Sequence, residues 1–138
     1  MKPMKDNHFI DTNILVYCYS NDEPNKREVS RSLVNSANVT ISTQVLTELS
    51  NVLRKRFNLQ WEEIESVLIE TASNFTIHIN LPETIAKACR IAKTYNFSFY
   101  DSLIISAAIE SNCSRLFSED MHDGMVIEEK LTIINPFK

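Results

Sequence analysis

Short apolar runs alternate with longer amphipathic segments along the chain. The runs predict buried strands that end at residue 10 and at residues 39–42, 75–79, 115–118 and 131–134. Apolar side chains that recur every three or four residues predict helices over residues 13–19, 25–36, 44–57, 61–73, 81–95 and 100–111. Strands separated by helices predict the α/β class. We expect one domain, 1–138, with three α/β/α layers around a mainly parallel sheet of four to five strands.

The first apolar run contains an acidic residue. Asp11 follows Phe9 and Ile10, and the apolar pattern resumes at Ile14. Asp11 therefore lies where the predicted strand turns into a helix, and ligands of open α/β sheets bind at this end of the strands. A carboxylate placed there costs free energy unless it is hydrogen-bonded, paired or bound to a metal. Asp11 is thus either a buried helix cap or the first part of a site.

Composition excludes several classes of protein. The 138 residues are 43% hydrophobic, which suits one domain with a real core. No run of residues is long and apolar enough for a membrane span, residues 1–8 lead into no signal-peptide core, and Cys18, Cys89 and Cys113 are too scattered for a disulfide framework. We expect a cytoplasmic protein with reduced thiols and no membrane partner. The single glycine, Gly124, excludes glycine-rich phosphate loops.

The formal charge of -4 is unusual for a protein that binds nucleic acid. Five acids stand out by position, namely Asp11, Glu48, Asp101, Asp120 and Asp123. Without them, 13 of the 18 acids remain against 14 Lys and Arg, so the rest of the surface is about neutral. Divalent metals at those five acids would make the site attractive to phosphate.

Each of the later acids has a plain structural interpretation beside the functional one. Glu48 borders the apolar stripe of its helix and can be a solvated or salt-bridged glutamate, with Lys55 as a partner. Asp101 opens a strongly apolar helix and can be an N-cap or first-turn residue. Asp120 and Asp123 follow a predicted strand in a polar loop that needs no function. His122 in the same loop fits a surface histidine better than a metal ligand.

The set of acids is more informative than its members. Parallel α/β topology brings the ends of the strands before Asp11 and Asp120 to one edge of the sheet, where helix starts such as Asp101 also gather. Carboxylates that converge there repel one another unless cations hold them. Oxygen ligands without a Cys or His pattern indicate Mg²⁺ or Mn²⁺ rather than zinc.

Four motifs occur in an order that resembles the PIN domain family, and within it the small stand-alone ribonucleases that are toxins of VapC-type toxin-antitoxin pairs. The motifs are the apolar-Asp11-Thr12-Asn13 opening, Thr47-Glu48-Leu49, Tyr100-Asp101-Ser102-Leu103, and Ser118-Glu119-Asp120 with Asp123-Gly124. Together they span nearly the whole chain.

The resemblance implies a Mg²⁺- or Mn²⁺-dependent endoribonuclease that hydrolyses phosphodiester bonds of RNA. It implies Asp11, Glu48, Asp101 and Asp120 as the catalytic and metal-binding acids, with Asp123 as an alternate metal ligand in the late loop. Thr12, Asn13 and Ser118 would orient these carboxylates and bound water. It also implies an antitoxin partner and a homodimer. Candidate contacts to the RNA backbone are Arg54, Lys55, Arg56, Lys26 and Arg27, each of which also fits a solvated charge.

Three rival interpretations remain. A PIN fold could serve only as a catalytically silent protein-interaction module, although the complete set of acids argues against that. A dehalogenase-type phosphatase requires a second Asp where this chain has Asn13. A phosphoryl-receiver domain requires paired acids after the first strand, and the segment before Asp11 supplies no such pair.

Overall fold

A computed structural model describes residues 7–36 and 38–138. Its strands are β1 (His8–Ile10), β2 (Val39–Ser42), β3 (Thr76–His78), β4 (Arg115–Phe117), β5 (Val126–Ile127) and β6 (Leu131–Ile134). Its helices are α1 (Thr12–Tyr17), α2 (Pro24–Val34), α3 (Thr43–Lys55), α4 (Trp61–Asn74), α5 (Pro82–Tyr95) and α6 (Phe99–Glu110). The predicted α/β class is confirmed, and each predicted helix and strand has a counterpart within a few residues.

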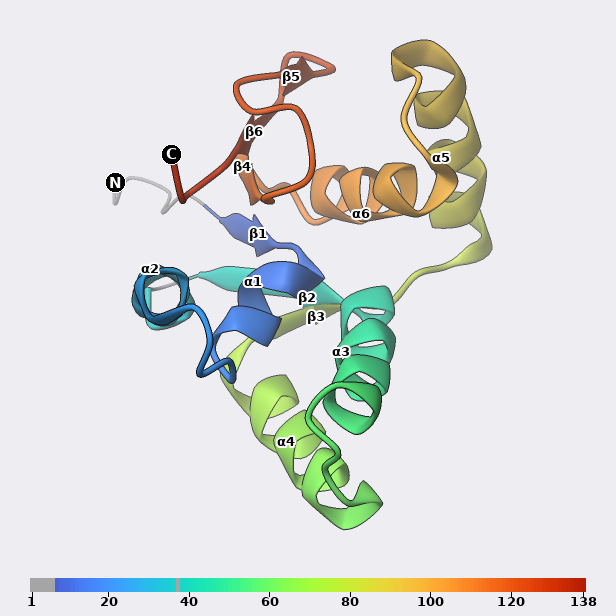
Figure 1. Ribbon diagram of the computed structural model, residues 1–138. Coiled ribbons are helices and arrows are strands. Elements are labelled where there is room, and N and C mark those ends of the chain that lie inside the picture. Colours follow the sequence, from blue (N-terminus) through green and yellow to red (C-terminus); the bar gives the residue numbers. More distant parts are fainter. Residues whose placement is uncertain (1–6, 37) are drawn as a thin grey trace, which may run out of the picture.

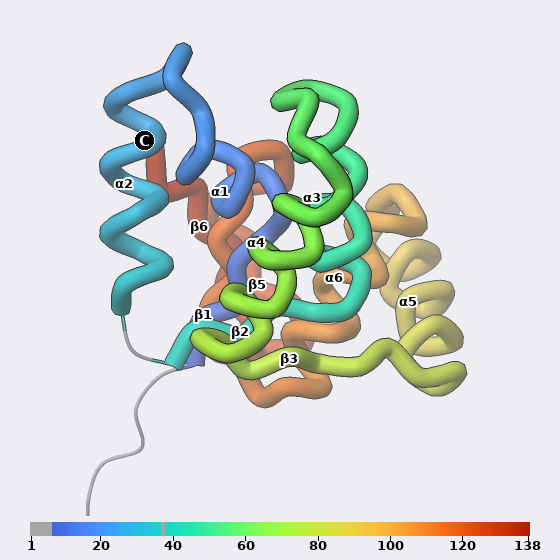
Figure 2. The backbone as a smooth tube through the Cα atoms, turned by 90° about the horizontal axis from the view of Figure 1, so that it is seen from below, coloured from blue at the N-terminus to red at the C-terminus, as the bar shows by residue number. Residues whose placement is uncertain are grey.

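The strands form one sheet in the order β3-β2-β1-β4-β6-β5. Every pair is parallel except β5 with β6, which is antiparallel. Helices α5 and α6 pack against each other, α1 packs against α2 and α3, and α3 packs against α4. Figure 1 shows α5 and α6 together beside β4, away from α1 to α4, and Figure 2 shows α1, α3 and α4 in front of the strands when the molecule is seen from below. This is the predicted three-layer arrangement, with the mainly parallel sheet in the middle.

The described part of the sheet has six strands, so the prediction of four to five was wrong by one edge strand. The missed strand, β5, is only two residues long, and Val126 pairs with Thr132 while Ile127 pairs with Leu131. Such a short strand has no alternation of its own to recognise, and the register of its longer partner defines it.

The central strand, β1, carries the start of the site. It pairs with β2 on one side and β4 on the other, and Phe9 and Ile10 are completely buried. Helix α6 packs against this core and is buried over Ser102–Ile109. The apolar side chains on all sides of α6 explain why its sequence lacks an amphipathic pattern.

Helix ends follow from local chemistry. The Ser42 side chain caps α3 by accepting from the backbone N of Val45, and Ser98 caps α6 in the same way through Asp101. Asn58, Asn96 and Asn112 adopt positive φ angles of 55°, 61° and 57°. Asparagine tolerates this left-handed conformation better than most residues, which suits a chain with one glycine.

In the described part of the chain, no helix combines the length and the apolar composition that crossing a membrane requires.

Candidate active site at the carboxyl edge of the sheet

Asp11 occupies the junction between β1 and α1, at the carboxyl edge of the sheet. It is the N-cap of α1, and its Oδ1 accepts a hydrogen bond of 2.7 Å from the backbone N of Thr12. Its Oδ2 accepts one of 2.9 Å from Ser118 Oγ, which directly follows β4. The Asp11 carboxylate therefore both caps the helix and bridges the ends of two neighbouring strands.

The surroundings of Asp11 disfavour its negative charge. Burial raises the pKa of its carboxyl group from 3.8 to about 6. The hydrogen bonds from Ser118 and Thr12 lower this pKa, whereas the charges of Glu48 and Asp101 raise it further. The charges of Glu48 and Asp101 thus lie within electrostatic reach of Asp11.

Glu48 is turned toward the same place from α3. Its Oε1 accepts a hydrogen bond of 2.7 Å from the hydroxyl of Thr12, which is buried next to Asp11. Among the ion pairs of the described residues there is none between Glu48 and Lys55. The structure therefore favours the interpretation of Glu48 as part of the acidic site over that of a salt-bridged rim residue.

Asp101 lies in the first turn of α6 and is not its cap. The cap is Ser98, whose hydroxyl accepts from the backbone N of Asp101 at 3.2 Å. The Asp101 carboxylate is therefore not used as the helix cap, and its charge raises the pKa of Asp11. The N-cap alternative for Asp101 is therefore wrong, although the first-turn position is confirmed.

The two acids of the late loop face different neighbours. Asp120 Oδ2 accepts a hydrogen bond of 2.5 Å from Asn13 Nδ2, so Asp120 lies beside the start of α1. Asp123 Oδ1 accepts one of 2.7 Å from the backbone N of Asn135, which belongs to the C-terminal segment. Asp120 is thus bonded to the residue two positions after Asp11, whereas Asp123 is bonded to the C-terminal segment. His122 is exposed, as expected.

A second cluster beside the site was not predicted from the sequence. Glu119 accepts from the Tyr17 hydroxyl at 2.5 Å and forms an ion pair of 2.5 Å with Lys26. The ring of Phe137 packs edge-on against Tyr17. Tyr17 and Lys26 are 102 and 93 residues away from Glu119 along the chain, so no local sequence pattern connects them. Lys26, a predicted RNA contact, is thus engaged in fixing the loop that precedes Asp120.

The acids suit a hard cation by their chemistry, although they are not drawn together. In residues 7–36 and 38–138, no three Asp, Glu, His or Cys side chains are placed to hold a metal ion as they stand. The carboxylates of Asp11, Glu48 and Asp120 accept hydrogen bonds from Ser118, Thr12 and Asn13, respectively. All-oxygen donors fit Mg²⁺ or Mn²⁺.

Replacing Ser118 by Ala tests how the site tunes Asp11. Loss of the Ser118 hydrogen bond should raise the pKa of Asp11 above about 6, because that bond stabilises the charged carboxylate. The free energy of unfolding should fall by about 1–3 kcal/mol at neutral pH. Carbon-detected NMR titration of the metal-free protein measures the pKa, and chemical denaturation measures stability.

Ser111→Ala is the matched control, because the Ser111 hydroxyl bonds only to the carbonyl of Ala107 in its own helix turn. An Asp11 pKa that is the same in both variants would contradict the role given to Ser118.

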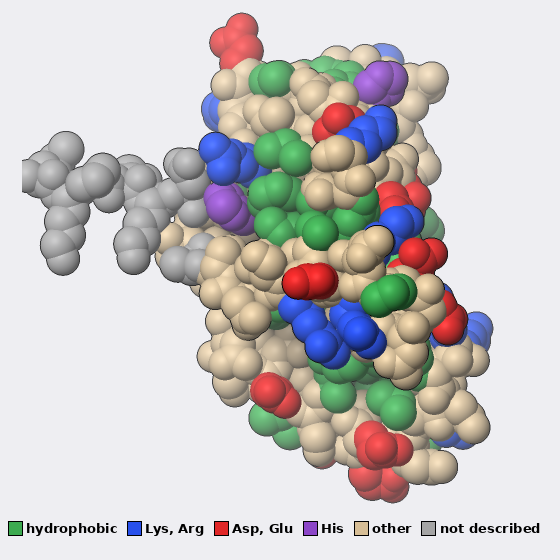
Figure 3. All heavy atoms as spheres, turned by 60° about the vertical axis from the view of Figure 1, so that its left-hand side comes forward, with side chains coloured by type: hydrophobic (Ala, Val, Ile, Leu, Met, Phe, Trp, Pro, Cys, Tyr) green, Lys and Arg blue, Asp and Glu red, His purple; other side chains and the backbone are tan. Residues whose placement is uncertain are grey.

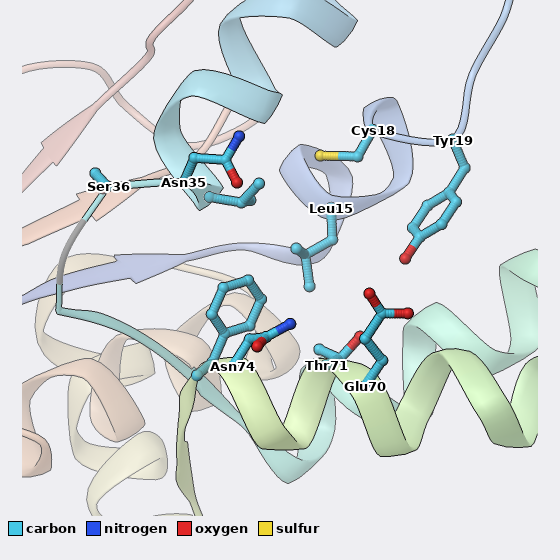
Figure 4. Close-up of a pocket in the computed structure, with 10 residues that line it drawn as sticks. Leu15, Cys18, Tyr19, Asn35, Ser36, Glu70, Thr71 and Asn74 are labelled. Atoms are coloured by element: carbon cyan, nitrogen blue, oxygen red, sulfur yellow. The ribbon is translucent and has the colours of Figure 1, made fainter.

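A separate hollow of about 450 Å³ lies between α1, the end of α2 and α4 (Figure 4). Leu15 projects into it, and the hydroxyl of Tyr19 points toward Glu70. None of the five predicted acids lines it. We therefore do not assign the chemistry to this hollow.

The charges on the molecular surface are mixed. Figure 3 shows a group of Lys and Arg side chains in the middle of one face, with acidic side chains around it. Among the other predicted RNA contacts, Arg54 donates to the carbonyl of Leu59 and lies over the ring of Trp61, and Arg27 donates to the carbonyl of Ser20. Lys55 is exposed.

A family model described as PIN domain matches residues 8–122. No curated protein gives a significant match. Among solved structures, a toxin-antitoxin complex from Klebsiella pneumoniae has a chain with a TM-score of 0.71 and 17% identity, covering 94% of this chain and 98% of its own.

Two further structures are similar. VapC20 of Mycobacterium tuberculosis, described as a sarcin-ricin loop cleaving toxin, has a TM-score of 0.67 and 16% identity, with 83% and 92% of the two chains covered. VapBC2 from Rickettsia felis, bound to a DNA fragment from its promoter, has a TM-score of 0.59 and 22% identity, with 82% and 87% covered. At these identities the likeness concerns the fold.

Proposed function

The chain belongs to the PIN domain family, and from this membership we propose that it is a Mg²⁺- or Mn²⁺-dependent endoribonuclease and the toxin of a toxin-antitoxin pair. The observation that carries the proposal is that Asp11 and Glu48 both accept hydrogen bonds from Thr12 at the carboxyl edge of the sheet, and that Glu48 and Asp101 lie close enough to raise the pKa of Asp11. A plain helix cap does not require two further acids within electrostatic reach.

Asp11, Glu48, Asp101 and Asp120 are the residues that would hold the metal. A bound Mg²⁺ or Mn²⁺ supplies an activated water and neutralises charge at the scissile phosphate. Thr12 and Ser118 hold the Glu48 and Asp11 carboxylates in place by hydrogen bonds, and Asn13 does the same for Asp120. This mechanism needs no side-chain nucleophile, because the activated water would attack the phosphorus atom directly.

The rival interpretations differ in what they need from the same residues. A dehalogenase-type phosphatase needs an acid at position 13, but Asn13 donates an amide hydrogen to Asp120. A catalytically silent interaction module needs no acids, and the raised pKa of Asp11 would then destabilise the fold without a benefit. These points support the nuclease.

Cleavage of RNA is the direct test. Purified protein is incubated with structured RNA in Mg²⁺, in Mn²⁺ and in EDTA, and we expect cleavage only with metal. If no RNA is cut and calorimetry detects no metal binding, the interaction module is the better interpretation.

Asp120→Asn and Asp123→Asn form a matched pair in this assay. We expect Asp120→Asn to lower the cleavage rate by about a hundredfold, because it removes a carboxylate from the metal site. Asp123→Asn should leave the rate nearly unchanged, because an amide oxygen still accepts from the backbone N of Asn135. A larger loss in Asp123→Asn would reassign the late metal ligand to Asp123.

We also propose an antitoxin partner and a cytoplasmic location. The Klebsiella and Rickettsia structures that resemble this chain are toxin-antitoxin complexes, and Cys18, Cys89 and Cys113 are free thiols, as a reducing compartment requires. A small DNA-binding protein encoded next to this gene should co-purify with the chain and inhibit cleavage. Analytical ultracentrifugation of the chain alone tests the expected homodimer.

A further inference from the structure

A second hollow, of about 300 Å³, adjoins the acidic site. Glu48 forms part of its wall, together with Gln44 of α3, Asn80 before α5, Ile85 of α5, and Tyr100 and Leu103 of α6. Because Glu48 faces both this hollow and Thr12 beside Asp11, a group held in the hollow lies next to the proposed metal site.

Two residues that line this hollow have a side-chain amide oxygen without a donor. Gln44 Oε1 and Asn80 Oδ1 are shielded from solvent and have no hydrogen-bond partner in the described part of the chain. Gln44 Nε2 donates to the carbonyl of Tyr100 at 3.2 Å, so the amide orientation that leaves Oε1 as the free acceptor is fixed by its neighbour. Buried acceptors without donors cost free energy, which a ligand with N–H groups would recover.

The rest of the wall is apolar and aromatic. Ile85 is 43% exposed and Tyr100 is 66% exposed, so the wall offers apolar and aromatic surface to a ligand. The Tyr100 ring also packs edge-on against Phe99. Proteins use an exposed aromatic ring to stack on an unpaired nucleobase, and nearby hydrogen-bond acceptors to recognise its edge.

We propose that this hollow binds the base of a nucleotide next to the scissile phosphate, and that it selects bases with an exocyclic amino group over uracil. The inference rests on the proposed ribonuclease function. Adenine, cytosine and guanine each have an amino group that the Gln44 and Asn80 oxygens accept once these side-chain amides turn toward the base. Uracil presents two carbonyls that flank its single N–H, so its oxygens would face the acceptors of the protein. Tyr100 stacks on the base, and Glu48 remains in the metal site.

Cleavage of a random-sequence RNA pool, followed by sequencing of the new ends, tests the selection. The parent protein should disfavour uracil by about tenfold at one position next to the cut. In the double variant Gln44→Ala/Asn80→Ala this preference should fall to within about twofold, while metal-dependent cleavage of the whole pool continues. Asn51→Ala, which removes an exposed amide from the same helix, should keep the parent preference.

A binding measurement separates this inference from the proposed function. NMR spectra of the full chain in EDTA are recorded with AMP, CMP, GMP or UMP, and the side-chain amide signals of Gln44 and Asn80 should move with the first three and not with UMP. Shifts without RNA cleavage would support the base site and overturn the nuclease. Cleavage with no selection against uracil, or with selection that the double variant keeps, would overturn the base site and leave the nuclease intact.

The same apolar surface could instead contact a second copy of the chain. Tyr100→Ala distinguishes the two occupants. We expect it to raise KM for RNA about tenfold and to leave the sedimentation coefficient unchanged. The base site would be overturned in favour of a contact between copies by two results together. Tyr100→Ala would convert a dimer to a monomer, and the parent would show no nucleotide-dependent NMR shift.

Discussion

Asp11→Asn should abolish metal-dependent RNA cleavage and at the same time stabilise the metal-free protein. We expect the cleavage rate to fall by about a thousandfold, because the variant removes the charge of the acid at the centre of the proposed metal site. The amide oxygen of Asn can still accept from the backbone N of Thr12, so the cap of α1 persists.

The gain in stability follows from the raised pKa of Asp11. Since the carboxyl group has a pKa of about 6 in the folded chain and an ordinary value of 3.8, folding is opposed by its ionisation. The penalty is absent below pH 3.8, grows as the pH rises through 6, and is complete above that. It amounts to about 3 kcal/mol before partial solvent exposure reduces it. The parent should therefore lose stability over this pH window.

Chemical denaturation in EDTA at several pH values measures this effect. The difference in unfolding free energy between Asp11→Asn and the parent should be small at pH 4 and should reach about 1–3 kcal/mol at pH 8. Adding Mg²⁺ should stabilise the parent more than the variant, because a cation that binds the folded state favours it by mass action. A variant that cleaves RNA at the parent rate would remove Asp11 from the mechanism.

Lys26 belongs to a cluster that holds the loop before Asp120 in place. Its ammonium group pairs with Glu119, the residue before Asp120, so the ion pair and the Tyr17 hydroxyl together hold the late loop. The sequence could not reveal this cluster, because its members are distant along the chain and each is an ordinary surface residue type. It did reveal Asp11, because an acid inside a short apolar run is costly wherever it is not used.

The choice between Asp120 and Asp123 shows the same limit. Both acids follow β4 in one polar loop, so spacing alone leaves them equivalent. The structure separates them through two long-range hydrogen bonds, from Asn13 to Asp120 and from Asn135 to Asp123. Strand β5 was missed for a related reason, since only its pairing with β6 defines it. Local pattern thus predicted the elements and the candidate acids, whereas tertiary contacts decided their partners.

Phe9→Ala should cause the largest loss of stability among the variants considered. The Phe9 side chain is 0% exposed in the central strand, two residues before Asp11, and β1 pairs with strands on both sides. Truncation leaves a cavity that the neighbouring strands cannot fill, so the free energy of unfolding should fall by about 3–5 kcal/mol. Guanidinium denaturation at a pH where the parent is fully folded measures this loss.

Phe99→Ala is the matched control for the ring. Phe99 is 39% exposed at the start of α6, so its truncation should cost less than about 1 kcal/mol. If Phe9→Ala keeps some folded protein, its cleavage rate per folded molecule should also fall, because the strand that holds Asp11 has lost the packing that fixes it. Equal losses of stability in the two variants would contradict the assignment of β1 as the buried support of the site.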